Sequence, residues 1–265
     1  MSKQVPYASK AQTLIFEILF FIYTNCMEKK IRIFLSETLE ENSKITLNRE
    51  QSHYISSVMR LDTGSELLLF NGIQGEFLGS VSSHSKKETI ISLRNKTRDQ
   101  SKSKNILLAF CPPKGHRLDF LIQKCTELGL KSFIPVISDH TINRKINKDR
   151  LKKIIIESCE QSDQLCVPDL LDSVSFKDFT HSLGSKETVL FADINSSANN
   201  LKELVQKDKE SKFILLVGPE GDFSSKERMQ IKEDKRFKNF SLGKNILRSE
   251  TAAIASLVLL NYLLN

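Results

Sequence analysis

The sequence has 265 residues, of which 40% are hydrophobic and 27% are charged, proportions typical of a globular chain. These values exclude a disordered, collagen-like or fibrous protein, and the length accommodates one large domain or two smaller ones. The net charge is +7, and Lys102–Lys153 alone contains twelve Lys or Arg against four Asp or Glu. A basic field of this kind attracts nucleic acid, although a solvated lysine-rich surface gives the same count.

The N-terminal residues 1–26 are interpreted as an extension that precedes the folded protein. Leu14–Tyr23 is apolar apart from Glu17, which is too short for a bilayer span of about 20 residues. The segment is similar to the apolar core of a secretory signal, but no small-residue cleavage site follows it. We favour a third interpretation, in which translation starts at Met27, and we expect no membrane association.

Residues 27–95 are expected to form a small β-rich domain, and residues 96–105, which are polar and charged, to form a linker. Apolar residues at helical spacing predict one helix over His53–Leu61. Four segments alternate or cluster like short strands. The expected strands are Ile31–Leu35, Glu66–Phe70, Gly75–Val81 and Thr89–Leu93.

Residues 106–265 are expected to form an α/β domain, because apolar strands alternate with helices. This alternation indicates a mostly parallel sheet with helices on both faces. The expected strands are Ile106–Cys111, Ser132–Ile137, Thr188–Ala192, Phe213–Val217 and Asn239–Leu242. The expected helices are Leu118–Leu128, Arg150–Gln161, Leu201–Lys207, Ser225–Ile231 and Thr251–Leu264.

Two glycine loops near the C-terminus form the candidate ligand site. The first, Gly218-Pro-Glu-Gly221, follows the strand Phe213–Val217, and the second contains Gly243. Glycine permits close backbone approaches, and ligands of open α/β sheets bind beyond the carboxyl ends of strands. Strand-to-helix turns also need glycine when nothing binds, so the loops alone name no ligand. Neither is a GxxxxGK[ST] or a GxGxxG loop.

The last helix and the cysteines bear on partners and compartment. Eleven of the fourteen residues Thr251–Leu264 are apolar. A helix that is apolar all round is buried all round, so we expect a second subunit to cover it in a homodimer.

The five cysteines form no Cys-x-x-Cys pair, which argues against disulfides and a metal site and favours the cytoplasm. They are Cys26, Cys111, Cys125, Cys159 and Cys166.

Five collinear blocks resemble the ribosomal RNA uridine-N3 methyltransferases of the SPOUT superfamily, the RsmE family. The resemblance begins near Lys29 and continues to the C-terminus. The blocks are HYISSVMRLDTGSELLLFNG at 53–72, KGHRLDFLIQKCTELGLKSFIPVIS at 114–138, ESCEQS at 157–162, LLVGPEGDFSSKE at 215–227 and SLGKNILRSETAAIASL at 241–257.

This resemblance implies the fold and the cofactor. The implied fold is a C-terminal SPOUT α/β domain with a trefoil knot, preceded by a small PUA-like β-barrel that binds RNA. The implied cofactor is S-adenosylmethionine, held mainly by the backbone of the two glycine loops. The residues expected to bind it are Leu216, Val217, Gly218, Pro219, Glu220, Gly221, Leu242, Gly243, Ile246, Leu247, Arg248, Thr251 and Ala252.

The implied reaction is methylation of N3 of a uridine, uridine 1498 in standard numbering, in 16S ribosomal RNA of the small subunit. Uridine N3 carries a proton on the Watson–Crick edge, so the base has to be unpaired or flipped out. Arg248 is expected to stabilise the developing uridine anion. Glu250 is a candidate base or orienting group, although the helix dipole alone also favours a carboxylate there.

Phosphate contacts are expected from basic residues in both domains, with one glutamine near the base. Such contacts position the RNA and carry little sequence information, and any of these side chains is equally explained as solvated surface. The RNA-binding candidates are Arg32, Arg60, Lys114, Arg117, Lys124, Arg144 and Gln161.

The sequence departs from the family pattern at three places. Asp222 stands where the family usually has a second glycine, so the turn is expected to be altered and more acidic. Lys244 and Asn245 replace a proline and an arginine, and Asp163 and Gln164 replace a glycine and an arginine. The two missing arginines bear more on RNA affinity than on cofactor binding.

Two other functions remain open. One is a SPOUT enzyme that methylates another RNA base or a ribose 2′-OH. The other is a non-catalytic RNA-binding factor in ribosome assembly. The intact GPEG and ILRSETA elements argue against the second.

Overall fold

The computed structural model describes residues 30–85, 88–194, 196, 201–207 and 212–264. The expected extension, residues 1–26, lies outside the described residues. Within them, every helix is too short or too polar to cross a membrane.

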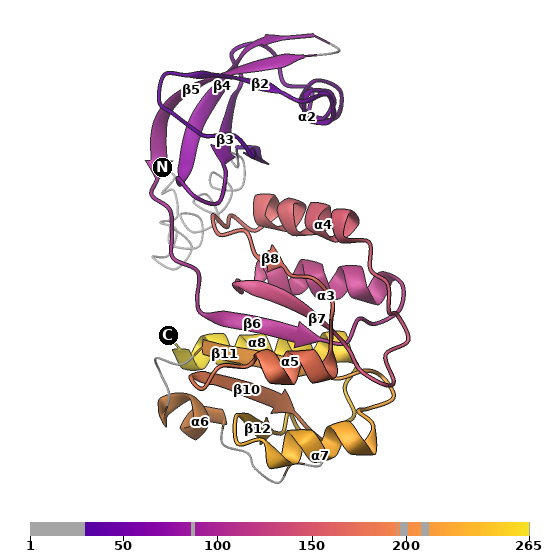
Figure 1. The fold of residues 1–265 in the computed structure, drawn as a ribbon. Helices are drawn as coiled ribbons and strands as arrows, with labels where there is room; N and C mark the ends of the chain where they lie inside the picture. Colours follow the sequence, from indigo (N-terminus) through magenta and orange to yellow (C-terminus); the bar gives the residue numbers. More distant parts are fainter. Residues whose placement is uncertain (1–29, 86–87, 195, 197–200, 208–211, 265) are drawn as a thin grey trace, which may run out of the picture. The chain divides into compact units, whose positions relative to one another are not determined.

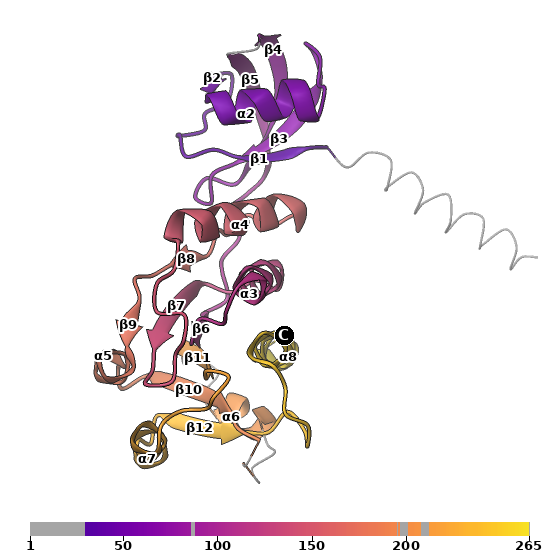
Figure 2. The same cartoon turned by 90° about the vertical axis from the view of Figure 1, so that its right-hand side faces the viewer.

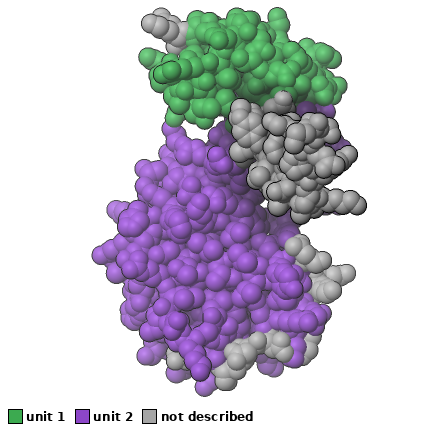
Figure 3. All heavy atoms as spheres, turned by 180° about the vertical axis from the view of Figure 1, so that it is seen from behind, with its two compact units in different colours: residues 1–33, 40–69, 77–95 green, residues 34–39, 70–76, 96–265 purple. Residues whose placement is uncertain are grey.

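The chain divides into two compact units, coloured green and purple in Figure 3. Unit 1 includes Glu40–Leu69 and Phe77–Asn95, together with the described residues that precede Phe34. Unit 2 consists of Phe34–Leu39, Phe70–Glu76 and the chain from Lys96 onward. Two short segments of the region expected to form the first domain therefore belong to the second unit.

A five-stranded sheet accounts for most of unit 1, and its strand order is β1-β3-β4-β5-β2. One short helix, α2, continues into a π-helical turn, η1 (Figure 1). The elements are β1 Arg32–Phe34, β2 Lys44–Leu47, α2 Arg49–His53, η1 Tyr54–Val58, β3 Glu66–Phe70, β4 Glu76–His84 and β5 Thr89–Arg98.

The helix expected over His53–Leu61 was misplaced. Helix α2 begins earlier because the Asn48 side chain accepts a hydrogen bond from the Gln51 amide, the usual N-cap arrangement. The helical segment ends before Arg60, which has a positive φ of 54°. Strand β2 was not expected at all.

The linker expected from residue 96 also begins too early. Strand β5 continues through Arg98, whose side chain is anchored by Glu76. The Arg98 Nη2 atom lies 2.6 Å from Glu76 Oε2, and the Glu76 side chain is only 3% exposed. Burial of this carboxylate needs a cationic partner, so the pair holds the last residues of β5 in place.

A parallel sheet forms the centre of unit 2, with the strand order β12-β10-β11-β6-β7-β8 and β9 paired with β7. The elements are β6 Ile106–Phe110, α3 His116–Glu127, β7 Ser132–Ile137, α4 Lys148–Gln161, β8 Asp169–Leu170, β9 Val174–Ser175, α5 Phe176–Ser182, β10 Glu187–Ala192, α6 Leu201–Lys207, β11 Lys212–Val217, α7 Ser225–Glu233, β12 Phe237–Phe240 and α8 Ser249–Leu264. The alternation of strands and helices predicted from the sequence is confirmed, while β8, β9 and α5 were missed.

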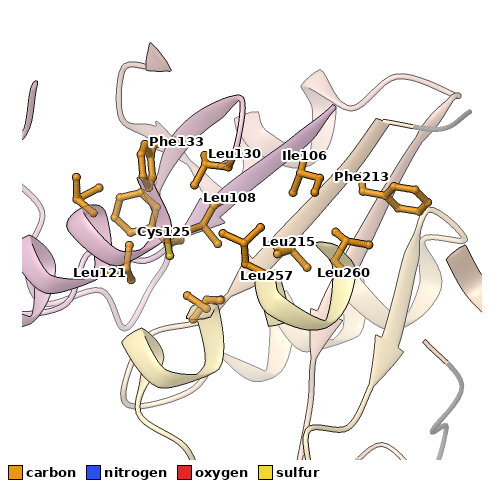
Figure 4. Close-up of a cluster of buried hydrophobic side chains, with 14 of the residues drawn as sticks. Ile106, Leu108, Leu121, Cys125, Leu130, Phe133, Phe213, Leu215, Leu257 and Leu260 are labelled. Atoms are coloured by element: carbon orange, nitrogen blue, oxygen red, sulfur yellow. The ribbon is translucent and has the colours of Figure 1, made fainter. Parts of the chain in front are cut away.

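Helices cover both faces of this sheet, as Figure 2 shows. Along β6, Ile106, Leu108 and Phe110 face a core shared with α3, α4, α6 and α8, whereas Leu107 and Ala109 face a core shared with α5 and α7. This two-residue alternation is the ordinary pleat of a strand, and apolar residues on both faces explain its uninterrupted hydrophobic run. In the first core, Leu257 and Leu260 of α8 lie against Leu215 of β11 (Figure 4).

Candidate active site

Parallel strands bring several loops together at one edge of the unit 2 sheet. Val217, at the end of β11, is level with Phe110, at the end of β6, and Ala192 of β10 is level with Phe240 of β12. The loops that follow these strands therefore leave from the same edge (Figure 1). Both glycine loops predicted from the sequence are among them.

The first loop makes a tight turn in which the Asp222 amide donates to the Pro219 carbonyl at 3.0 Å. A Cβ atom on Gly218 would lie 2.8 Å from the ring of Phe223. That ring cannot easily move, because it packs against Phe176 and Phe191 at centroid distances of 5.2 and 5.6 Å. Gly218 is thus required by a close approach between the loop and the core beneath it.

Asp222 has a left-handed backbone conformation and forms an ion pair. Its φ is +62°, a left-handed conformation that aspartate tolerates better than most residues. Its carboxylate accepts from Arg228, which also donates to Asp193 at 2.7 Å. Burial alone would lower the pKa of Arg228, but the hydrogen bonds that it donates to Asp193 and Asp222 outweigh this effect and raise that pKa. The negative charge of Asp222 is therefore paired within the turn.

A histidine from the loop after β7 holds the same turn from another side. His140 Nδ1 lies 2.8 Å from the carbonyl oxygen of Asp222 and 3.3 Å from that of Gly221. Because a carbonyl only accepts hydrogen bonds, Nδ1 carries the proton in this arrangement. Its neighbour Asp139 accepts from Ser224 Oγ at 2.6 Å, at the N-cap of α7. Residues that follow two strands, β7 and β10, thus fix the geometry of the first glycine loop.

The second glycine loop is exposed, in contrast to the helix that follows it. Gly243 through Arg248 are all exposed, and the Ile246 side chain is 88% exposed. The Arg248 carbonyl accepts from the Ala252 amide at 2.8 Å, so this arginine directly precedes α8. Glu250 is only 7% exposed and accepts a hydrogen bond from Ser249 Oγ at 3.3 Å. The two catalytic candidates therefore differ in access: Arg248 is open to a ligand and Glu250 is not.

The candidates of unit 2 fall into two groups: Lys114, Arg117 and Arg144 lie near this edge, whereas Lys124 and Gln161 belong to the last turns of α3 and α4. Arg117, in the first turn of α3, lies 3.9 Å from Glu220 of the first glycine loop. Lys114 is exposed just before it. Arg144 donates to the Asp139 carbonyl at 2.9 Å, and Lys124 pairs with Glu127 at 2.8 Å. Gln161, the last residue of α4, is exposed.

The two basic candidates of unit 1 have different surroundings. Arg60 is exposed. Arg32 is only 5% exposed, in β1. A guanidinium buried to this extent is not available to a phosphate, so we leave Arg32 out of the RNA surface proposed below.

Four residues of the site were missed by sequence reasoning, namely Asp139, His140, Asp193 and Arg228. A usable signal existed for three of them, since Asp139, His140 and Asp193 follow the apolar strands β7 and β10 directly. The rule applied to the glycine loops, that ligand-site residues follow the carboxyl ends of parallel strands, selects them as well. Arg228 gave no such signal, because it lies inside a helix.

Comparisons with known proteins agree with this architecture. A family model described as an RNA methyltransferase domain matches residues 100–261, and one described as an RNA methyltransferase PUA domain matches residues 47–93. The fold, the glycine loops and these two matches define the chain as an RNA methyltransferase with a PUA-like N-terminal region. Relatives named ribosomal RNA small subunit methyltransferase E are 32% identical in Rickettsia conorii (85% of this chain, 93% of the relative) and 28% identical in Bacillus subtilis (85% and 93%).

The chain belongs to the ribosomal RNA small subunit methyltransferase E family. A solved structure of such an enzyme from Neisseria gonorrhoeae, bound to S-adenosyl methionine, superimposes with a TM-score of 0.78 at 27% identity and covers 88% of this chain and 98% of its own. The family and the α/β fold class predicted from the sequence are thereby confirmed.

Proposed function

We propose that the protein transfers a methyl group from S-adenosylmethionine to N3 of uridine 1498 in 16S ribosomal RNA. Membership of the family supports this reaction, as does the neighbouring structure crystallised with S-adenosyl methionine. The observation that carries the proposal is the pair of glycine loops at one sheet edge, the first fixed by surrounding residues and the second exposed.

The two loops fit the proposed cofactor in shape and chemistry. Gly218 and Gly221 leave the backbone of the first loop accessible, and a Cβ at Gly221 would meet nothing closer than His140 Cβ at 3.8 Å. Ile246 and Leu247 are 88% and 36% exposed, and an adenine ring would cover such apolar side chains favourably. The Glu220 carboxylate supplies a negative charge beside a cationic sulfonium group. We assign the thirteen cofactor-binding residues predicted from the sequence to this site.

The chain's own contribution to the reaction is positioning and charge stabilisation. The bound cofactor supplies an activated methyl group for in-line transfer, a reaction in which correct orientation lowers much of the barrier. Arg248 is exposed and adjacent to α8, so we assign it to the O2 or O4 atom of the uridine, where negative charge develops once N3 has lost its proton. Glu250 is buried against Ser249, which favours the orienting role over that of the base.

We assign RNA binding to the exposed or half-exposed basic side chains of both units. These are Arg60, Lys114, Arg117, Lys124 and Arg144, together with the exposed Gln161. They lie on loops and helix ends and supply phosphate contacts that position the RNA. The PUA-like region contributes Arg60 to this surface.

We also propose that the protein is a homodimer that acts in the cytoplasm, where small ribosomal subunits are assembled. Helix α8 is covered by the sheet on one side, but Val258, Leu259 and Tyr262 on the other side are 46%, 42% and 78% exposed. These residues recur at helical spacing and form one apolar stripe. A second copy of the chain that packs the same stripe against it would remove this surface from water.

The proposed reaction is tested by nucleoside mass spectrometry of 16S ribosomal RNA from a strain that lacks the gene. We expect loss of 3-methyluridine and its restoration by the intact gene but not by Arg248→Ala. Loss of a different methylated nucleoside would identify another RNA methyltransferase activity. Cofactor binding by calorimetry without any methylation of small subunits would favour an assembly factor instead.

A further inference from the structure

A second cavity opens at the same sheet edge, outside the two glycine loops. It has a volume of about 390 Å³ and lies between the loop after β6 and the segment between β7 and α4. This volume is within the range of small-molecule and nucleotide sites, roughly 300–1,000 Å³. We call it the β6–β7 pocket; its lining includes Lys114, Leu118, Ile142, Asn143, Lys145 and Arg150.

The lining combines the two kinds of group that bind a nucleotide. Lys114, Lys145 and Arg150 are cationic, and no carboxylate is among the residues that line the pocket. Arg150 is held in place by Asp119, at 2.6 Å. Ile142 and Ile146 provide apolar surface, since Ile142 is 58% exposed and Ile146 is half-buried, whereas Leu118 is only 2% exposed. A phosphate would be attracted by the cations, and a base would cover the apolar side chains.

An amide group adds a means of contacting a base edge. Asn143 Nδ2 donates to the Pro113 carbonyl at 3.2 Å, which orients the side chain. Among the described residues no hydrogen bond reaches Asn143 Oδ1, so this acceptor and the second amide hydrogen are available to a ligand. An amide offers one donor and one acceptor side by side, as base edges do.

The pocket lies beside the proposed cofactor site. Strand β6 is the direct neighbour of β11, and β7 is the next strand, which corresponds to lateral spacings of about 5 and 10 Å from β11. Arg117, between the pocket residues Gly115 and Leu118, reaches Glu220 of the first glycine loop at 3.9 Å. The pocket and the proposed cofactor site therefore lie at the same sheet edge, one to two strands apart.

We propose that the β6–β7 pocket binds one unpaired RNA nucleotide adjacent to the methylated uridine, with its phosphate at the cations and its base on Ile142 and Ile146. This inference rests on the proposed function. Single-stranded RNA is bound in this manner because extruding a target base disrupts the stacking of its neighbours, which then need new apolar partners. Recognition of the neighbour selects the target without contacts to the target itself.

The test is a cycle of two changes, one in the protein and one in the RNA. Ile142→Asp alters the pocket, and Met229→Asp on α7 is the matched control, because the two side chains are 58% and 60% exposed. The RNAs are a single-stranded decamer around the target uridine and the same decamer with one abasic ribose beside that uridine. Their dissociation constants are measured by fluorescence anisotropy at low salt, with the abasic ribose placed on either side in turn.

In the wild-type protein and in Met229→Asp, we expect loss of the neighbouring base to weaken binding roughly five- to 150-fold on one side of the target. In Ile142→Asp the same loss of the base should have little further effect on binding, because the base no longer has the apolar contact with Ile142. Repulsion between the new carboxylate and the phosphates affects both RNAs equally and cancels in this comparison. All three proteins should bind S-adenosylmethionine with equal affinity, which shows that they are folded.

Equal effects of base loss in the wild type and Ile142→Asp would overturn the inference, as would failure of the wild type to bind the decamer. The proposed function is judged separately by nucleoside analysis. If the protein methylates uridine N3 but base loss has the same effect in the wild type and in Ile142→Asp, only the proposed nucleotide pocket is refuted. If the effect of base loss depends on Ile142 but the protein methylates no RNA, the nucleotide pocket is supported and the proposed reaction is refuted.

Discussion

The guanidinium of Arg228 is joined to the carboxylate of Asp222 at 2.7 Å, across the start of α7. The φ of Asp222 is +62°, a value that glycine adopts freely. The aspartate therefore accepts a backbone conformation it does not favour while it forms an ion pair that glycine cannot form. The two effects can be separated by substitution.

Replacing Asp222 tests both contributions to the first glycine loop. Asp222→Gly removes the ion pair but keeps the turn, and we expect S-adenosylmethionine affinity to fall about twofold to fivefold, since a partly exposed pair contributes roughly 0.2–1 kcal/mol. Asp222→Val also disfavours the left-handed conformation, at a cost of roughly 1–2 kcal/mol, and should weaken binding about fivefold to thirtyfold beyond Asp222→Gly. Isothermal titration calorimetry of both variants measures their affinities for S-adenosylmethionine. Equal affinities for the two would show that the turn does not depend on this conformation.

Gly218→Ala tests the close approach between the loop and Phe223. The new methyl group would lie 2.8 Å from a ring that two other phenylalanines hold in place, and such overpacking costs about 1–3 kcal/mol. We expect a lower thermal midpoint and weaker cofactor binding. Gly221→Ala is the control for stability, because its Cβ meets nothing within 3.8 Å. A thermal midpoint unchanged in Gly218→Ala would contradict the packing described.

Arg98→Met should destabilise the protein because it leaves the Glu76 carboxylate buried without its cation. We expect a loss of about 2 kcal/mol in the free energy of unfolding, less than for a fully buried pair because Arg98 is 38% exposed. Adding Glu76→Gln should recover part of that loss. Arg94→Met is the control, since Arg94 and its partner Glu66 are 50% and 34% exposed, and we expect a change below about 0.5 kcal/mol. Urea denaturation at fixed protein concentration measures the free energy of unfolding of the wild type and of the three variants.

The apolar stripe of α8 predicts the oligomeric state. Sedimentation velocity at micromolar concentration should give a dimer for the wild type and a monomer for Leu259→Lys/Tyr262→Lys, because the stripe cannot bury two lysines against a second copy. Met229→Lys, a change at an equally exposed apolar residue of α7, should remain dimeric. A monomeric wild type would refute the proposed dimer.

Sequence reasoning located elements that are buried on both faces and failed where structure depends on distant partners. Phe213–Val217 was predicted as a strand from its apolar run, and β11 differs only by beginning at Lys212. Helix α5 was missed although the Ser175 N-cap and the buried Phe176 and Phe179 mark its first turns. The contacts that hold the first glycine loop could not be predicted together. They join Asp139 and His140, which follow β7, Asp193, which follows β10, and Arg228 of α7.

Resemblance contributed what periodicity could not. It supplied the cofactor, the reaction and the trefoil knot, and the knot remains a prediction. The pattern of glycines indicated where a ligand binds, but it did not distinguish S-adenosylmethionine from any other nucleoside. Burial then separated Arg248, the candidate for charge stabilisation, from Glu250, the candidate base or orienting group.

Unit 2 is assembled from three stretches of chain, and its core includes Phe70 from a segment that precedes β4. No single cut in the polypeptide can therefore release it intact. A truncated gene that begins after β5 would lack Phe34–Leu39 and Phe70–Glu76 and would expose the apolar surface they cover. Limited proteolysis near residue 100 should accordingly yield two fragments that stay associated until they are denatured, and fusion or deletion boundaries are better placed outside residues 34–264.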